Sequence, residues 1–505
     1  MTTTAALRQV LTPEVLREQA IRVGACVRPV LTQVTDTATG EQTVVPIPCG
    51  STRAKRCPSC ADKNRRLRMQ QCREGWHLEH EPSTGDASAL EADPSDSDAE
   101  DHEADEDQDE PSRRVRSTRR RQDVPDLPRL PVQNRTIGRT FRAPSGKVYR
   151  PSMFITLTLP SYGPVRSDGT PVNPATYDYR RAALDALHFP KVADRWWQNL
   201  RRACGYNVQY FATVEAQRRL APHLHAGVRG AIPRQLIRQV AAATYHQVWW
   251  PPHDQVIYPD HRLPEWDERT GGYVDQHTGV MLPTWDQALD ALDANSDPQP
   301  VHVVRLGRQV DIQGIVAESG QADKRVGYLC KYLTKTIDET YGDDATPAQL
   351  AHMDRLHEQA RWLPCSPGCW NWLRYGTQPE HAESGMVPGQ CPKAAHDRAN
   401  LGLGGRRVLV SRKWTGKTLT QHRADRAEVV RQVLDAAGVQ MHDTNRWSTT
   451  ATDDQGRPRY RWTTVDPDDL DLPTYRQVLT KAIGDRLAWR QQYDQAKTRA
   501  GPPGT

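Results

Sequence analysis

The sequence predicts an α+β fold in which an antiparallel sheet, flanked by helices, lies between two cysteine-rich modules of the zinc-binding kind. Short β-branched and apolar segments alternate irregularly with helical segments between residues 136 and 345. Cysteines gather on either side of this region, at 26–60 and at 365–391. With 505 residues, the chain is long enough for two or three domains.

The N-terminal part contains two predicted units. Residues 1–25 form a helical lead, because Pro13 suits a first turn and apolar residues follow it at helical spacing. Residues 26–76 form a module with four cysteines, which ends in a basic helical segment.

Residues 77–135 are predicted to be a disordered linker. Residues 81–110 contain fourteen Asp and Glu and no Lys or Arg, and an arginine-rich and then a proline-rich stretch follow. Such a composition buries too little apolar surface to offset its conformational entropy. Removing these fourteen negative charges raises the formal net charge from +5 to +19. The rest of the chain is therefore strongly basic, which favours a nucleic acid as partner.

Residues 136–345 carry the predicted sheet. Runs of apolar and β-branched residues bounded by proline or glycine indicate strands at 153–159, 208–215, 223–228 and 301–305. Helical spacing of apolar residues indicates helices at 180–204, 233–250, 284–293 and 327–335.

The C-terminal third divides into two predicted segments. Residues 346–425 hold a second group of cysteines and histidines, followed by a basic stretch. Residues 426–505 form a helical region, and we expect helices near 419–437 and 474–498.

The chain lacks the features of export and of membrane insertion. Its first residues have no apolar core of a signal peptide, and no segment approaches the roughly 18 apolar residues of a membrane span. We therefore expect a cytoplasmic protein with no membrane partner. Because the cytoplasm keeps thiols reduced, metal binding explains the ten cysteines better than disulfides do.

A carboxylate and two imidazoles form the first candidate site. His223 and His225 alternate with Leu224 on a predicted strand, so both point to one face of the sheet. A hairpin loop at 218–220 would place Glu215 opposite His223 on the preceding strand. Two imidazoles and one carboxylate can bind Mg²⁺ or Mn²⁺ and leave positions open for a phosphate oxygen.

Two tyrosines and two lysines form the second candidate group. Tyr328 and Tyr332 are one turn apart on the helix predicted at 327–335, and Lys331 and Lys335 follow each by three residues. A phenol has a pKa near 10 and attacks poorly unless a metal or a lysine stabilises its anion. Core packing of the tyrosines is the structural alternative.

Four cysteines near the N-terminus indicate a structural Zn²⁺ site. They are Cys26, Cys49, Cys57 and Cys60, with Cys72 as an alternative fourth ligand. Free buried thiols are the competing interpretation.

A second set of residues also matches structural Zn²⁺ chemistry. It consists of Cys365, Cys369, Cys391 and His396, with His381 as a possible substitute for His396. We expect Cys204 and Cys330 to pack in the interior.

Three segments occur in the order typical of a known superfamily. They are Phe154–Pro160, Pro222–Ala226 and the Tyr328-x-x-x-Tyr332-x-x-Lys335 segment. Together they resemble the three motifs of the HUH endonucleases. The chain resembles more narrowly the RepSA-like rolling-circle replication initiators of actinobacterial plasmids, on the segments Cys26–Pro29, Cys57–Cys60, Asn371–Gly376 and Gly404–Trp414.

This resemblance implies a fold, a reaction and partners. The fold is a five-stranded antiparallel HUH endonuclease sheet with the histidines on a central strand. The reaction is metal-dependent nicking of one strand at the double-strand origin, which leaves a 5′-phosphotyrosyl intermediate and a 3′-OH primer. His223, His225 and Glu215 would bind the metal and Tyr332 would attack. The partners are plasmid origin DNA, in single- and double-stranded form, and the host helicase and polymerase.

Position 328 departs from the usual plasmid pattern. Many plasmid initiators of this type have a glutamate there, whereas phage-type initiators use two tyrosines alternately, and this chain has Tyr328. Whether Tyr328 attacks, supports the site or packs is left open by the sequence. The alternative functions are a conjugative relaxase or an HUH transposase, and a non-catalytic, zinc-stabilised DNA-binding regulator.

Overall fold

The computed structural model describes residues 12–78, 80–82, 127–137, 140–142, 144–146, 148–316, 320–331, 333–436, 451–453, 455–465 and 472–500. Tyr332 and most of the acidic run, residues 83–110, lie outside the described residues.

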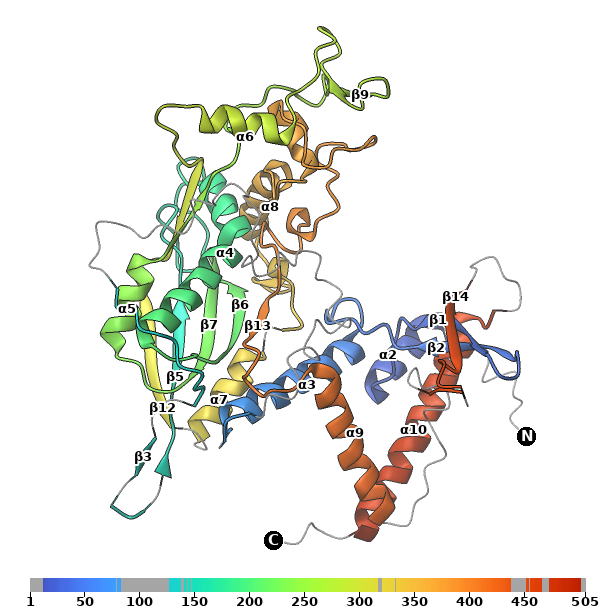
Figure 1. Ribbon diagram of the computed structural model, residues 1–505. Helices are drawn as coiled ribbons and strands as arrows, with labels where there is room; N and C mark the ends of the chain where they lie inside the picture. The colour runs from blue at the N-terminus through green and yellow to red at the C-terminus, as the bar shows by residue number, and fades with distance from the viewer. Residues whose placement is uncertain are drawn as a thin grey trace.

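A five-stranded antiparallel sheet forms the centre of the molecule (Figure 1). Its order is β12 (Val310–Val316), β5 (Pro151–Leu157), β7 (Pro222–Arg229), β6 (Tyr210–Ala216) and β13 (Val408–Val410). The three inner strands are those that the sequence predicts, but the two edge strands are not predicted. Because β13 comes from the segment assigned to the second cysteine module, the sheet is not confined to residues 136–345.

Helices cover both faces of this sheet. They are α3 (Pro58–Trp76), α4 (Tyr179–Cys204), α5 (Arg234–Ala243) and α7 (Gly320–Leu329), and α8 (Pro347–Trp362) packs on α4. Leu224 and Ala226 of β7 are fully buried on the face that packs against α4, whose Trp196 and Trp197 fill the core. His223 alternates with them and faces the other side, where α3 and α7 contact β7.

The last helix of the N-terminal cysteine module is part of this sheet domain. Trp76 ends α3 and is buried, and its indole nitrogen donates to the Ser152 hydroxyl at 2.8 Å. Its ring lies against Gly227 and meets Trp414 edge-on, with ring centres 6.2 Å apart. The module at 26–76 and the nickase domain predicted from the sequence therefore share one core.

Between residues 233 and 305, one predicted helix is too long, and one predicted strand is confirmed but lies outside the main sheet. The helix expected at 233–250 ends at Ala243, and β8 (Tyr245–Val248) follows. The strand expected at 301–305 is β11 (His302–Arg305), which pairs with β8 in a two-stranded ribbon outside the main sheet. The chain passes from helix to strand at Thr244. Its backbone is already extended (ψ 130°), and its hydroxyl donates to the Val240 carbonyl in the last turn of α5.

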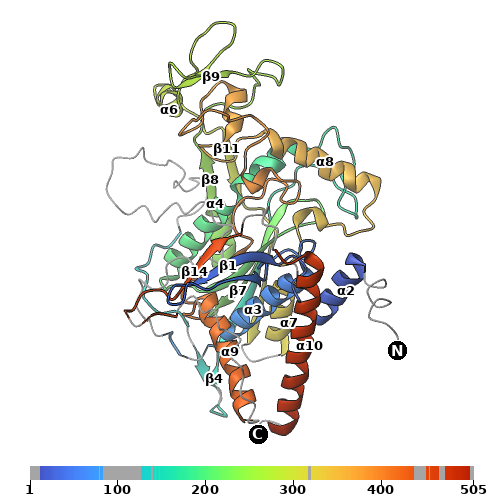
Figure 2. The same ribbon diagram turned by 90° about the vertical axis from the view of Figure 1, so that its right-hand side faces the viewer.

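The rest of this region forms a projection above α4 (Figures 1 and 2). It contains β9 (Glu265–Asp267), β10 (Gly272–Val274) and α6 (Trp285–Asp293). The hairpin β3 (Phe141–Arg142) and β4 (Val148–Tyr149) lies at the opposite end of the sheet domain, and the short 3₁₀ helices are η4 (Ile337–Glu339), η5 (Trp370–Tyr375) and η6 (Ala394–His396).

The helix predicted at 327–335 is also wrong in its bounds. α7 spans Gly320–Leu329, and the amide of Lys331 closes a turn onto the Tyr328 carbonyl. Tyr328 thus lies in the last turn of α7, while Lys331 and Lys335 lie beyond the helix.

The two ends of the chain build one unit. β1 (Val30–Asp36) pairs with β2 (Gln42–Ile47) and with β14 (Tyr460–Thr464) in a three-stranded antiparallel sheet. The C-terminal helices are α9 (Leu419–Ala436) and α10 (Tyr475–Ala500). Elements from the regions predicted at 1–25, 26–76 and 426–505 therefore pack together.

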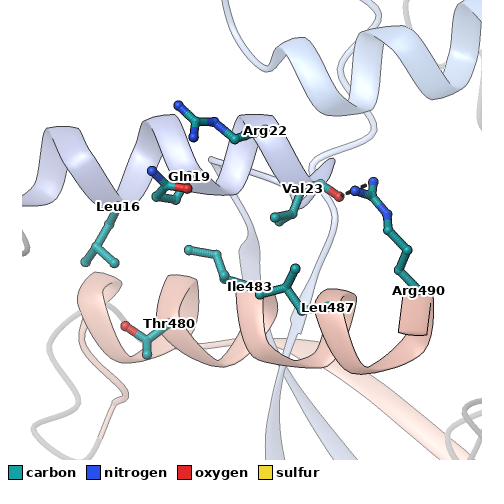
Figure 3. Close-up of a pocket in the computed structure, with 8 residues that line it drawn as sticks. All are labelled: Leu16, Gln19, Arg22, Val23, Thr480, Ile483, Leu487 and Arg490. Atoms are coloured by element: carbon teal, nitrogen blue, oxygen red, sulfur yellow. Dashed lines mark hydrogen bonds between the residues drawn. The ribbon is translucent and has the colours of Figure 1, made fainter. Parts of the chain in front are cut away.

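The contact between α10 and α2 (Pro13–Val23) joins these ends (Figure 3). Leu16 and Val23 of α2 face Ile483 and Leu487 of α10, and Arg490 donates to the Val23 carbonyl at 3.3 Å.

The predicted linker at 77–135 is too long at both ends. The Glu81 carboxylate accepts hydrogen bonds from the Thr136 and Ile137 amides, and Leu127 is buried in the main core. The amide of Leu130 donates to the Arg202 carbonyl of α4. In the described part of the chain, no helix is long and apolar enough to cross a membrane.

Candidate metal and tyrosine site

Glu215, His223 and His225 meet on one face of the sheet. The pairing of β6 with β7 sets Glu215 opposite His223, as the spacing around the turn predicts. Leu220 takes a left-handed conformation (φ 63°) in this turn, and the Gln217 amide donates to the Ala221 carbonyl. The register of one local hairpin therefore brings the three side chains together.

The ligand atoms of these three residues lie within 4.8 Å of one another. The Nε2 atoms of His223 and His225 are 2.7 Å apart, and the His225 Nε2 lies 4.0 Å from a Glu215 carboxylate oxygen. The other carboxylate oxygen of Glu215 is buried and has no hydrogen-bond partner in the described part of the chain.

Hydrogen bonds behind the rings fix their orientation. His223 Nδ1 lies 3.0 Å from the Glu215 backbone carbonyl, and His225 Nδ1 lies 2.9 Å from the Thr156 hydroxyl. Both rings therefore turn Nε2 toward the same point. Carbonyls and hydroxyls in this position commonly orient the histidine ligands of metals.

Burial shifts the pKa of all three groups toward their neutral forms. Desolvation raises the pKa of Glu215 to about 7, although Arg407 and Lys331 oppose this shift. Desolvation lowers the pKa of His223 to about 4 and that of His225 to about 3. Neutral imidazoles have free lone pairs, and an unpartnered buried carboxylate gains from a cation. This donor set fits a divalent metal such as Mg²⁺ or Mn²⁺.

Tyr328 borders the same point. Its hydroxyl lies 3.2 Å from His225 Nε2, its ring meets Phe154 edge-on, and the residue is 37% exposed. The phenol is thus open to solvent on one side and next to the imidazole on the other. Tyr332, predicted as the attacking residue, lies outside the described residues. The side chains of Lys331 and Lys335 are exposed.

Two arginines near the site were not predicted. The Arg325 guanidinium lies 4.7 Å from the centre of the Phe154 ring and lowers the pKa of His225. Arg407, which precedes β13, donates to the Val214 carbonyl of β6 and to the Lys335 carbonyl. It thereby ties the segment after α7 to the strand that carries Glu215. From the sequence, Arg407 was recognisable only as part of the basic segment 404–414, and nothing in that segment predicts its contact with β6.

The four N-terminal cysteines converge as predicted. The sulfur atoms of Cys26, Cys49, Cys57 and Cys60 lie within 4.8 Å of one another, and those of Cys26 and Cys57 are 3.8 Å apart. Tetrahedral ligands about 2.3 Å from Zn²⁺ are separated by about this distance. Cys72 is not the fourth ligand, because its side chain is buried with Trp76 and Trp414 beside Cys330.

The second set also converges. Cys365, Cys369, Cys391 and His396 lie within the same limit, and His396 Nε2 is 3.4 Å from the Cys369 sulfur. His396 Nδ1 lies 2.8 Å from the Ala360 carbonyl, which leaves Nε2 to face the sulfurs. His381 is not part of this group. The donor set fits Zn²⁺.

The chain is similar to proteins that initiate replication. A family model described as "Replication initiator protein, pSAM2" matches residues 12–482. A replication initiator protein from Streptomyces ambofaciens is 25% identical over 248 residues, which cover 41% of this chain and 47% of that protein. The chain thus spans about half the length of this curated relative. No solved structure matches.

Proposed function

The chain belongs to the RepSA family of replication initiator proteins, and on this premise we propose that it initiates plasmid replication by cutting one strand of origin DNA with a tyrosine. The supporting observation is the position of the Tyr328 hydroxyl, 3.2 Å from an imidazole of the Glu215, His223 and His225 group. An HUH-type nickase uses a tyrosine hydroxyl beside a divalent-metal site for its reaction. The name of the Streptomyces relative supports the same role.

In this proposal the side chains of Glu215, His223 and His225 hold Mg²⁺ or Mn²⁺. When bound, the metal ion would polarise the scissile phosphate. Glu215 supplies the negative charge of the site, and Thr156 keeps the His225 lone pair directed toward it. Arg325, together with Lys331, places positive charge where the transition state gains negative charge on the phosphate oxygens.

The reaction is an exchange of one ester for another. The tyrosine loses its proton and its oxygen bonds to phosphorus, while the bond from phosphorus to the sugar 3′ oxygen breaks. That oxygen takes up a proton and becomes the 3′-OH primer. The 5′ phosphate stays bonded to the tyrosine. This phosphotyrosyl ester can later be attacked by a 3′-OH, which rejoins the DNA strand without another energy source. Host helicase and polymerase would then extend the primer.

The two tyrosines are proposed to have different roles. The resemblance to HUH initiators assigns the attack to Tyr332, while Tyr328 is the described phenol at the metal-binding face. We therefore propose that Tyr332 forms the first adduct and that Tyr328 supports the site or makes a second attack.

The two cysteine-containing groups are proposed as structural Zn²⁺ sites. Each closes with four soft or nitrogen ligands and leaves no open position, as structural zinc sites do. The first would hold the loops around β1 and β2 to α3, and the second would hold η5 and η6 to the end of α8.

A nicking assay on supercoiled origin plasmid with Mn²⁺ or Mg²⁺ tests the proposed function. We expect an open-circular product with protein joined to its 5′ end, and no product after His225→Ala. Tyr332→Phe should abolish the adduct, whereas Tyr258→Phe, in the distant projection, should not. An adduct that survives Tyr332→Phe and disappears with Tyr328→Phe would reverse the assignment. Origin binding without nicking would instead indicate the zinc-stabilised DNA-binding regulator.

A further inference from the structure

A hollow lined by arginines lies between helices from the two ends of the chain. Its volume is about 350 Å³, and its lining residues are Arg66, Met69, Gln70 and Arg73 of α3 and Arg426 of α9. In Figures 1 and 2, α9 and α10 meet at their far ends and diverge toward α3. The hollow itself is lined by side chains of α3 and α9.

Arg486 of α10 lies close enough to Arg66 of α3 for their charges to interact, although no residue of α10 lines the hollow. The positive charges of Arg490 and Arg66 lower the pKa of Arg486, after the larger effect of burial. The Nε of Arg486 is buried and has no hydrogen-bond partner within the described residues. Like charges from α3 and α10 therefore approach each other at some electrostatic cost, which a bound anion would relieve.

Nearby acidic groups offset only part of this charge. Arg66 pairs with Asp62 at 2.8 Å and Arg73 pairs with Asp323 at 3.0 Å, and both arginine side chains remain more than half exposed. Arg426 lines the hollow from α9. Exposed pairs of this kind are weak, so either arginine can turn toward a ligand.

We propose that this hollow binds the phosphate backbone of double-stranded DNA, as a contact surface separate from the nicking site. Arg66 and Arg73 are two turns apart, about 10 Å along α3. One small anion cannot bridge that distance, whereas a duplex presents about one charge per 1.7 Å of its axis. α3 also contacts α7, which carries Tyr328, so the bound duplex would adjoin the proposed site of cutting. The choice of DNA over another polyanion rests on the proposed function.

The test compares two triple variants for binding to a short duplex of arbitrary sequence. The first is Arg66→Gln, Arg73→Gln and Arg426→Gln. The control removes the same three charges from side chains of α9 and α10 that do not line the hollow: Arg431→Gln, Lys481→Gln and Lys497→Gln. Equal Tm values would show that both variants are folded.

Affinity is measured at several salt concentrations, because each phosphate contact contributes about one unit to the slope of log K against log [salt]. We expect the hollow variant to lose about three units of slope and the control to lose less than one. Equal slopes in the two variants would overturn the inference. Tighter hollow-dependent binding of duplex RNA than of duplex DNA would also overturn it. Because nicking is not measured, a protein that fails to nick would refute the proposed function and leave this result intact.

Discussion

At the scale of single residues, the Thr156 hydroxyl controls the direction of the His225 ring. It lies 2.9 Å from Nδ1, on the side opposite the proposed metal. Thr156→Val keeps the shape and removes this contact, so we expect Mn²⁺ affinity to fall about 10- to 100-fold. Isothermal titration of the zinc-loaded protein with Mn²⁺ measures the change.

Thr158→Val is the matched control for this prediction. Its hydroxyl donates to the Gln309 carbonyl and not to the proposed site. Unchanged Mn²⁺ affinity in Thr156→Val, or an equal loss in Thr158→Val, would contradict the role of this hydroxyl.

His352 makes stability depend on pH. It is buried in α8, with Nδ1 2.9 Å from the Tyr179 hydroxyl, and desolvation lowers its pKa to about 4. In the unfolded chain a histidine titrates near 6.5, so below that pH the unfolded state binds a proton that the folded state does not. Stability is therefore full above pH 6.5 and falls toward pH 4, by about 1.4 kcal/mol at pH 5.5 from this group.

Chemical denaturation at pH 7.5 and 5.5 checks this expectation. His352→Gln should lose less stability than the wild type between the two values. His277→Gln, at an exposed position, should lose as much as the wild type. An equally large loss in His352→Gln would show that other groups cause the pH dependence.

The residues of the candidate site could be predicted from the sequence where they lie close together along the chain. Glu215, His223 and His225 belong to one hairpin, so strand periodicity and turn length were enough to place them together. Arg407 could not be found in this way, because it reaches the site through pairing of β13 with β6, almost two hundred residues away. The position of Tyr328 beside His225 depends equally on the packing of α7 on β7.

At the scale of elements, Gly227 allows α3 to pack on the sheet. A Cβ atom at this position would lie 2.5 Å from the Trp76 ring. We expect Gly227→Ala to displace Trp76, to break its bond to Ser152, and to destabilise the protein by about 1–3 kcal/mol. Gly314→Ala in β12 is the control, because nothing lies within 4 Å of its added Cβ. Equal unfolding free energies for the two variants would contradict this role of Gly227.

The predicted bounds of elements were wrong where the spacing of apolar residues is compatible with both a helix and a strand. The apolar run after Pro233 continues through Val248 with helical spacing, but its last four residues find a partner strand in β11. β13 has only three residues, too few for any periodicity, and β12 pairs along its whole length with β5. β8, β12 and β13 are strands because they pair with strands that are distant in the sequence. The local sequence of each segment does not predict this pairing.

At the scale of the whole molecule, the N- and C-terminal segments form one sheet and one packed cluster together. β14 pairs with β1, and Leu479 of α10 packs on the same cluster as Cys57 and Cys60. The sequence predicted separate regions at the two ends of the chain, because contacts more than 400 residues apart leave no local pattern. The first cysteine group thus lies where both ends of the chain meet.

The two proposed zinc sites should therefore stabilise different parts of the molecule. We expect Cys57→Ser to lose one of two Zn²⁺ ions and to increase amide hydrogen exchange in α2, α3 and α10, which pack around that group. Cys391→Ser should lose the other ion and increase exchange in α8, η5 and η6 instead. Cys204→Ser is the control and should keep both ions, since Cys204 belongs to neither group. Zinc analysis together with exchange mapped by peptide separates the outcomes. Retention of both ions in Cys57→Ser, or the same exchange pattern in both variants, would show that the cysteines are ordinary buried thiols and that packing alone joins the two ends of the chain.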